Sequence, residues 1–135
     1  MNGPLGVAAD DSGNIWVADQ VNNRVLRFSP PFTNGMAATL ELGQADLTGT
    51  SANRGGSVAA NTLSGPIGLT FDSFGDLFVA DQGNHRVLEY VPPFTNGAAA
   101  SVALGQSALN ANSVGSGTTG MNDPQGVRFD GTGNL

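Results

Sequence analysis

Internal repetition constrains this chain more than any other feature of its sequence. Residues 3–44 and residues 65–106 align without a gap at an offset of 62 residues. The stretch GPLGVAADDSGNIWVADQVNNRVLRFSPPFTNG recurs as GPIGLTFDSFGDLFVADQGNHRVLEYVPPFTNG, and LELGQ recurs as VALGQ. A third copy begins 58 residues later as DPQGVRFDGTGNL. Repetition at such a spacing indicates a fold that stacks copies of one small unit.

Each copy predicts four short strands and no helix. The strands are expected at about residues 6–9, 15–19, 25–28 and 38–42, and again at 68–71, 77–81, 87–91 and 100–104. The helical period of 3.6 is absent from these runs. DDSGN and DSFGD are interpreted as turns, because Asp opens them and Gly follows where a positive φ is favoured. The prolines of PPFTNG cannot donate to a sheet ladder, so they must end the third strand.

A four-stranded unit at this spacing is typical of an all-β fold, the β-propeller, whose blades are twisted antiparallel sheets around a channel. The pattern P-x-G-V…D-x-x-G-N-I-W-V-A-D-x-x-N-N-R-V, which both full copies follow, resembles the NHL repeat. We therefore expect a first blade at residues 1–62, a second blade at 63–122, and the first strand of an incomplete third blade at 123–135. A long polar stretch after the fourth strand lengthens the unit beyond the roughly 40 to 50 residues of common propeller repeats.

Two blades cannot close a ring, and their open edges would offer unpaired backbone groups to other chains. Propellers have about four to eight blades, and the NHL resemblance implies six. Three copies of the chain would supply six blades, so we expect a head-to-tail homotrimer, with a four-bladed dimer and an eight-bladed tetramer as alternatives. MNGP at residues 1–4 aligns with MNDP at 121–124. We expect the chain to be a slice of a longer propeller, with residues 123–135 overlapping the next copy's N-terminus.

The charges argue against two classes of partner. The chain has no lysine, and its five arginines are set against eleven acidic residues, giving a net charge of -6. No basic patch is expected for nucleic acid or for an anionic membrane surface. The absence of cysteine removes disulfides and thiolate metal sites. No apolar run approaches the roughly 20 residues of a membrane span. The N-terminus lacks a signal-peptide pattern. The sequence does not indicate a compartment.

One constellation recurs where the second strand ends and the third begins. Its members are Asp19, Asn22 and Arg24 in the first copy, and Asp81, Asn84 and Arg86 in the second. We interpret them as structural: Asp and Asn bond to local amides, and Arg bridges blades. His85, the only histidine, stands where the first copy has Asn23, and a lone histidine is a poor metal site. We interpret His85 as a surface turn residue and retain it, with Asp123, as a candidate for catalysis.

Three further aspartates open the glycine-containing turns: Asp10, Asp72 and Asp130. They lack the alternating oxygen ligands and the closing glutamate of a calcium loop. We interpret them as turn residues.

The NHL resemblance also implies an enzymatic alternative. In overall architecture, NHL repeats are similar to six-bladed calcium-dependent lactonases and esterases of the gluconolactonase and paraoxonase type. Those enzymes hold calcium with Asn or Asp where the innermost strand begins. The matching positions here are Leu5, Ile67 and Gln125, and two of the three are aliphatic, which argues against that mechanism.

Other polar residues lie near the same rim. Threefold symmetry would gather three copies of Asn122 or of Asp123 around one ion, so these two are the candidate ligands for calcium or another divalent cation. Asn2, Asn122 and Gln125 are the candidates for binding a ligand. No Gly-x-Ser-x-Gly turn and no phosphate-binding loop is present.

The sequence therefore predicts a binding scaffold whose partners, a protein or a small molecule, meet the loop-bearing face or the channel. The loops at residues 43–64 and 105–122 are small, polar and Gly-rich, and loops on a rigid scaffold commonly carry recognition. The alternative is a metal-dependent hydrolase of esters, lactones or phosphotriesters at the channel mouth. A third interpretation is a propeller fragment with no selected activity.

Overall fold

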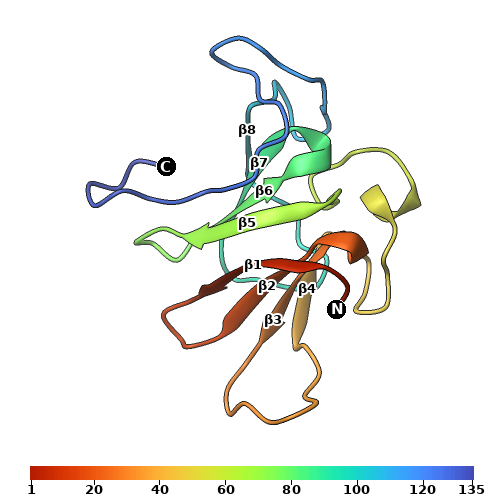
Figure 1. The fold of residues 1–135 in the computed structure, drawn as a ribbon, viewed down its shortest axis with the longest axis vertical. Helices are drawn as coiled ribbons and strands as arrows, with labels where there is room; N and C mark the ends of the chain where they lie inside the picture. Colours follow the sequence, from red (N-terminus) through yellow and green to blue (C-terminus); the bar gives the residue numbers. More distant parts are fainter.

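The computed structural model describes residues 1–135 as two four-stranded antiparallel sheets, here called blade 1 and blade 2 (Figure 1). Blade 1 has the strand order β1-β2-β3-β4, with β1 Pro4–Ala9, β2 Ile15–Asp19, β3 Arg24–Phe28 and β4 Leu40–Leu42. Blade 2 has the order β5-β6-β7-β8, with β5 Pro66–Phe71, β6 Leu77–Asp81, β7 Arg86–Tyr90 and β8 Val102–Leu104. Three 3₁₀ turns complete the elements: η1 Gln20–Asn22, η2 Ala52–Gly55 and η3 Gln82–Asn84. None is long and apolar enough to cross a membrane.

The predicted strands are present, and the differences from the sequence-based bounds are small. The fourth strand of each blade is shorter than expected, beginning at Leu40 and Val102. The expected five-residue loop between the second and third strands is a single 3₁₀ turn closed by a left-handed residue, Asn23 in blade 1 and His85 in blade 2. Asn and His are among the residues that adopt a positive φ most readily.

Each blade has two faces because side chains alternate along a strand. The front face of blade 1 carries Trp16, Val25 and Leu42, and the front face of blade 2 carries their repeat equivalents Phe78, Val87 and Leu104. The back face of blade 1 carries Val7, Val17 and Leu26, and that of blade 2 carries Leu69, Val79 and Leu88.

The hydrophobic core lies between the two blades, where the front face of blade 1 packs against the back face of blade 2. Its fully or nearly buried members from blade 1 are Trp16, Ala18, Val25, Leu40 and Leu42, and those from the rest of the chain are Leu63, Leu69, Leu77, Val79, Leu88, Tyr90 and Ala100. Burial of each large apolar side chain contributes roughly 1.5–3 kcal/mol. The blades are therefore held together by face-to-face packing, with β1 and β5 lying side by side at one edge (Figure 1).

The third repeat copy extends the same stacking by one segment. Residues 121–135 run alongside β5 (Figure 1), in the position that β5 has relative to β1, but no strand is assigned to them. Met121 packs on Gly105 as Leu63 packs on Gly43. These residues thus mark the start of a third unit without a second strand beside them.

Candidate functional site

Asp81, at the end of β6, collects three hydrogen bonds in a buried setting. Its carboxylate accepts from the Ser64 amide at 2.7 Å, from Asn84 Nδ2 at 2.8 Å and from Arg86 Nε at 2.8 Å. Burial raises the pKa of Asp81, and the Arg86 guanidinium and the other donors oppose that effect. The three residues that the sequence grouped here are thus brought together around one carboxylate.

Arg86 connects this carboxylate to two loops. Its Nη2 donates to the carbonyl of Ala59 at 3.0 Å and to that of Thr62 at 2.8 Å, both in the connection from blade 1. Its Nη1 donates to the carbonyl of Leu109, in the loop that follows blade 2. Because every guanidinium nitrogen has an acceptor and the side chain is fully buried, Arg86 is a structural crosslink between blades.

Arg24 is the equivalent residue in blade 1, and its interactions are incomplete. Its Nε lies 2.9 Å from Asp19 Oδ2, and its Nη1 donates to the carbonyl of Leu47 at 2.5 Å. Its Nη2 has no acceptor within residues 1–135, unlike Nη2 of Arg86. Burial of Asp19 is outweighed by the hydrogen bonds from Asn22, the Asn2 amide and Arg24, which together lower the pKa of Asp19.

His85 forms a contact between repeat units. Its Nδ1 accepts a hydrogen bond from the Asp123 amide at 3.2 Å. Asn23 does the same in blade 1, where its Oδ1 accepts from the Gly65 amide at 2.8 Å. The His85 side chain is only 18% exposed, so it is more covered than a surface turn residue, because the third copy docks on it. The two catalytic candidates therefore meet, and the Asp123 carboxylate also lies 3.2 Å from His85 Nδ1.

The other polar candidates do not converge on one point. The Asn2 amide is engaged with Asp19, and its carbonyl accepts from the Val21 amide. Asn122 and Gln125 lie on the third copy, beside β5. No group of three His, Cys, Asp or Glu side chains is arranged to hold a metal ion.

The innermost strands approach each other closely at two glycines. A Cβ atom on Gly6 would lie 2.1 Å from the carbonyl oxygen of Ile67, and one on Gly68 would lie 2.7 Å from that of Gln125. Any side chain would separate the strands, so the glycine of P-x-G sets the spacing of the units. Leu5, at the rim position in the first copy, is more than half exposed.

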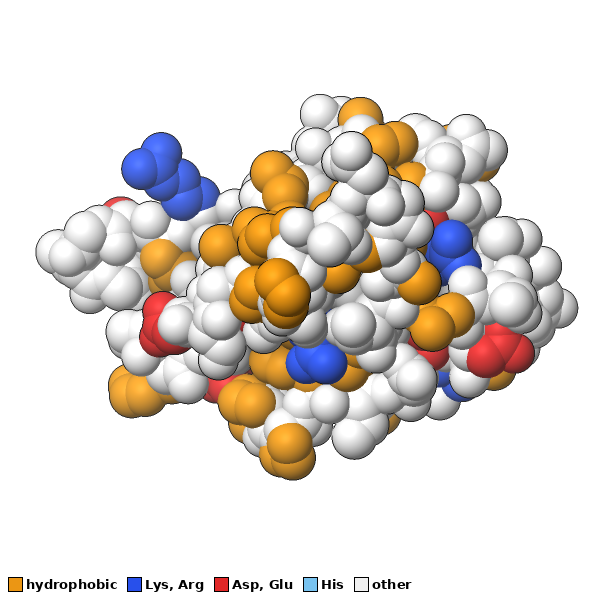
Figure 2. All heavy atoms as spheres, turned by 90° about the horizontal axis from the view of Figure 1, so that it is seen from below, with side chains coloured by type: hydrophobic (Ala, Val, Ile, Leu, Met, Phe, Trp, Pro, Cys, Tyr) orange, Lys and Arg blue, Asp and Glu red, His pale blue; other side chains and the backbone are white.

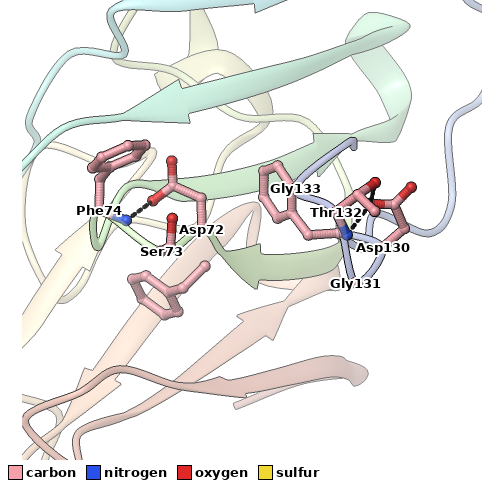
Figure 3. A pocket seen from close by; sticks show the side chains of 9 residues that line it. Asp72, Ser73, Phe74, Asp130, Gly131, Thr132 and Gly133 are labelled. Atoms are coloured by element: carbon pink, nitrogen blue, oxygen red, sulfur yellow. Dashed lines mark hydrogen bonds between the residues drawn. The ribbon is translucent and has the colours of Figure 1, made fainter.

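The turns of blade 2 and of the third copy enclose a cleft of about 560 Å³ (Figure 3). Asp72 and Asp130 lie on its opposite sides, and Phe129 lines it. Asp72 Oδ1 accepts from the Phe74 amide at 2.8 Å. Hydrogen bonds from the Asn134 side chain and backbone, and from Thr132, hold the pKa of Asp130 well below its usual range. Both carboxylates are therefore engaged with their own turns.

A polar hollow of about 420 Å³ lies on the face that carries the connecting loops. It is lined by Asn53, Gly56, Ser57, Val58, Asn110 and Asn112. The sequence predicted these loops as the binding face but singled out none of these residues, because the hollow forms only when residues 53–58 and 110–112 come together. Part of the first loop is structural: Arg54 Nη2 donates to the carbonyls of Gln44 and Gly97.

The sequence interpretation also missed an aromatic contact across the blade junction. Phe94, in the PPFTNG block of blade 2, lies 4.9 Å from Trp16 of blade 1, centroid to centroid, in an edge-to-face arrangement. The repeated phenylalanine of PPFTNG was the available signal, since a loop has no local need for an aromatic ring at a fixed position.

Comparison with known families assigns the repeats independently. The family model of the NHL repeat matches residues 1–28 and residues 63–90. Each match ends with the third strand of its blade. No curated protein matches the chain at a significant level.

Proposed function

The chain contains two NHL repeats, and from that premise we propose that it forms part of a closed β-propeller that acts as a binding scaffold. Three copies arranged head to tail supply six blades and close the ring. The observation that supports this proposal is the packing of blade 1 on blade 2 through opposite faces. Such packing leaves one front face and one back face without a partner blade, and heterologous contacts of this kind form rings when the rotation closes.

The ring is tested by the mass of the assembly in solution. Light scattering after gel filtration, across the micromolar range, should give three times the chain mass of 13.6 kDa. A stable monomer would exclude the ring, and a dimer or tetramer would exclude six blades.

The partner of the scaffold meets the loop-bearing face at the polar hollow. Asn110 and Asn112 offer side-chain amide donors and acceptors there, whereas the Asn53 amide is paired with that of Asn84. Gly56, which also lines the hollow, lets a ligand backbone approach closely. These features suit a hydrogen-bonding partner such as an extended peptide.

A peptide-display selection tests this surface. Peptides selected on the wild-type chain should lose most of their binding to the double variant N110A/N112A, whose thermal unfolding serves as the fold control. Selected peptides that bind the double variant equally well would place recognition elsewhere.

A further inference from the structure

Equivalent positions in the two blades differ sharply in exposure. On the back face, Leu69 of blade 2 is 7% exposed because blade 1 covers it, whereas its equivalent Val7 in blade 1 is 65% exposed. On the front face the order is reversed: Leu42 of blade 1 is fully buried, and its equivalent Leu104 in blade 2 is 36% exposed. The other two residues of the front face of blade 2, Phe78 and Val87, are buried, but beside residues 121–135 and not beneath another blade. The back face of blade 1 and the front face of blade 2 are called free because neither packs on another blade, and each repeats a face that is packed inside the chain.

The free back face of blade 1 has the chemistry of a packing surface. Figure 2, which views the molecule from the side of blade 1, shows hydrophobic side chains gathered on this side. A groove of about 300 Å³ on blade 1 is lined by Met1, Leu26, Phe28, Met36, Leu47 and Arg24, among others. Met1 is 65% exposed, whereas its equivalent in blade 2, Leu63, is fully buried in the core.

The repeat equivalents of the two residues in the aromatic contact between the blades do not form that contact with each other. Phe94 packs on Trp16 in the junction. Its equivalent in blade 1, Phe32, is 53% exposed. The equivalent of Trp16 in blade 2 is Phe78, which stacks only with Phe129. Phe32 lacks an aromatic partner, and Phe78 lacks the partner that would correspond to Phe94.

The polar contact is unmatched in the same way. Arg86 Nη2 donates to the carbonyls of Ala59 and Thr62, and the Thr62 amide donates to the Ala59 carbonyl at 3.4 Å, which closes a turn. The corresponding residues before the third copy are Gly117 and Gly120, joined by the same hydrogen bond at 3.3 Å. The turn that would accept a hydrogen bond from an arginine is thus already formed in the loop after blade 2. Arg24 Nη2, the equivalent of the donor Arg86 Nη2, has no acceptor within the chain.

We propose that a second copy of the chain docks its free back face on the free front face of blade 2. In this junction Phe32 of the arriving copy packs on Phe78, and Arg24 of the arriving copy donates to the carbonyls of Gly117 and Gly120. The junction rests on the ring of the proposed function and specifies its contacts. A second copy is the occupant because the internal junction shows this same pair of faces already packed together.

Residues 121–135 occupy the place that β1 of the arriving copy needs. They lie against β5 as β5 lies against β1, with Gly68 facing Gln125 as Gly6 faces Ile67. β1 is secured by its ladder to β2, from Pro4↔Asp19 to Ala9↔Ile15. Residues 121–135 have no such ladder, so they are the segment that leaves when a copy docks.

Cross-linking tests the junction, because the chain has no cysteine of its own. Variants F32C and F78C are prepared separately, mixed, and treated with a short bismaleimide. The mixture should give a covalent dimer, whereas either variant alone should give only background, since a head-to-tail junction never places two copies of one position together. The double variant W16C/F94C should cross-link within one chain and calibrates the reagent.

Two outcomes separate this junction from the ring. If the wild type has the trimeric mass but the mixture cross-links no better than the single variants, the junction is wrong and the ring stands. If the wild type is a monomer, both fail. Because F78C alters a nearly buried residue, V7E serves as a second variant. Val7 is exposed within the chain, so the V7E chain should keep its fold, as measured by circular dichroism. Its association should weaken at least about tenfold. Unchanged association of V7E would overturn the junction.

Discussion

Arg86 Nε lies 2.8 Å from Asp81 Oδ2, and neither side chain is exposed to solvent. The equivalent pair in blade 1, Arg24 and Asp19, has a distance of 2.9 Å, but Arg24 is 11% exposed. Arg86 donates to carbonyls in the loop before its blade and in the loop after it. The carbonyls to which Arg24 donates all lie in the loop after its own blade. The same repeat residue therefore has two environments, and removing it should have two different effects.

Replacing Arg86 by Ala should lower the free energy of unfolding by about 3–5 kcal/mol, because it leaves the buried Asp81 carboxylate without its cation. R24A should cost less, roughly 1–3 kcal/mol, because Arg24 is 11% exposed and has no counterpart of the bonds from Arg86 to the carbonyls of Ala59 and Thr62. Urea unfolding of both variants under monomeric conditions measures the difference. Equal losses would show that the blade-to-blade bonds of Arg86 add nothing.

Tyr90 is buried between the blades, and its hydroxyl has no hydrogen-bond partner. Blade 1 has Phe28 at the equivalent position. Because a buried hydroxyl without a partner costs about 1–3 kcal/mol, Y90F should be at least as stable as the wild type. Y90A, which removes the ring as well, should lose about 3–5 kcal/mol. A marked loss of stability in Y90F by thermal unfolding would show that the hydroxyl is bonded.

The strands could be predicted from the sequence because they depend on local patterns. Period-two alternation and Asp–Gly turns placed all eight strands, and the spacing of Asp81 and Arg86 across one tight turn was enough to group them. The shared glycine of the P-x-G pattern was visible too, but its physical reason, a close approach between Gly6 and the Ile67 carbonyl, requires the neighbouring strand.

Contacts between repeat units could not be predicted from the sequence. Coverage of His85 depends on where residues 121–135 lie, and no local pattern fixes that position. Glu41 aligns with Ala103 in the second copy, so the repeat suggests a tolerant surface position. In the structure Glu41 is fully buried, because Asn96 and Gly97 of blade 2 pair with its backbone.

Glu41 should make stability depend on pH. Burial raises the pKa of Glu41 above its ordinary value of 4.5, against the opposing hydrogen bond from the Gln44 amide and the nearby Arg54. Its Oε1 has no hydrogen-bond partner. Since the folded chain favours the protonated form, this contribution is present below about pH 4.5 and is lost as pH rises through the raised value.

The variant E41Q is neutral at every pH and should lack this loss. The stability of E41Q relative to the wild type should therefore increase between pH 4 and pH 7, by urea unfolding at several pH values. Other acidic groups are common to both chains and cancel in the difference. A difference that stays constant over this range would show that the pKa of Glu41 is not raised.

Gly6 and Gly126 hold equivalent positions in the first and third copies, but their surroundings differ. A Cβ on Gly6 would meet the Ile67 backbone, whereas one on Gly126 would meet nothing within 4 Å. G6A should cost about 1–3 kcal/mol, as overpacking does, while G126A should be nearly neutral. Thermal unfolding of the two variants checks this, and similar behaviour would mean that the inner strands can separate without cost.

Residues 121–135 should compete with assembly, because they occupy the place beside β5 that an arriving β1 would take. A segment docked about 90% of the time lowers the apparent affinity of its competitor about tenfold. The chain without these residues should therefore associate about tenfold more tightly, as measured by mass against concentration. Replacing residues 121–135 by a Gly–Ser linker of the same length is the matched control and should give the same gain. The proposed displacement would be refuted if either change weakened association, because residues 121–135 would then be part of the junction.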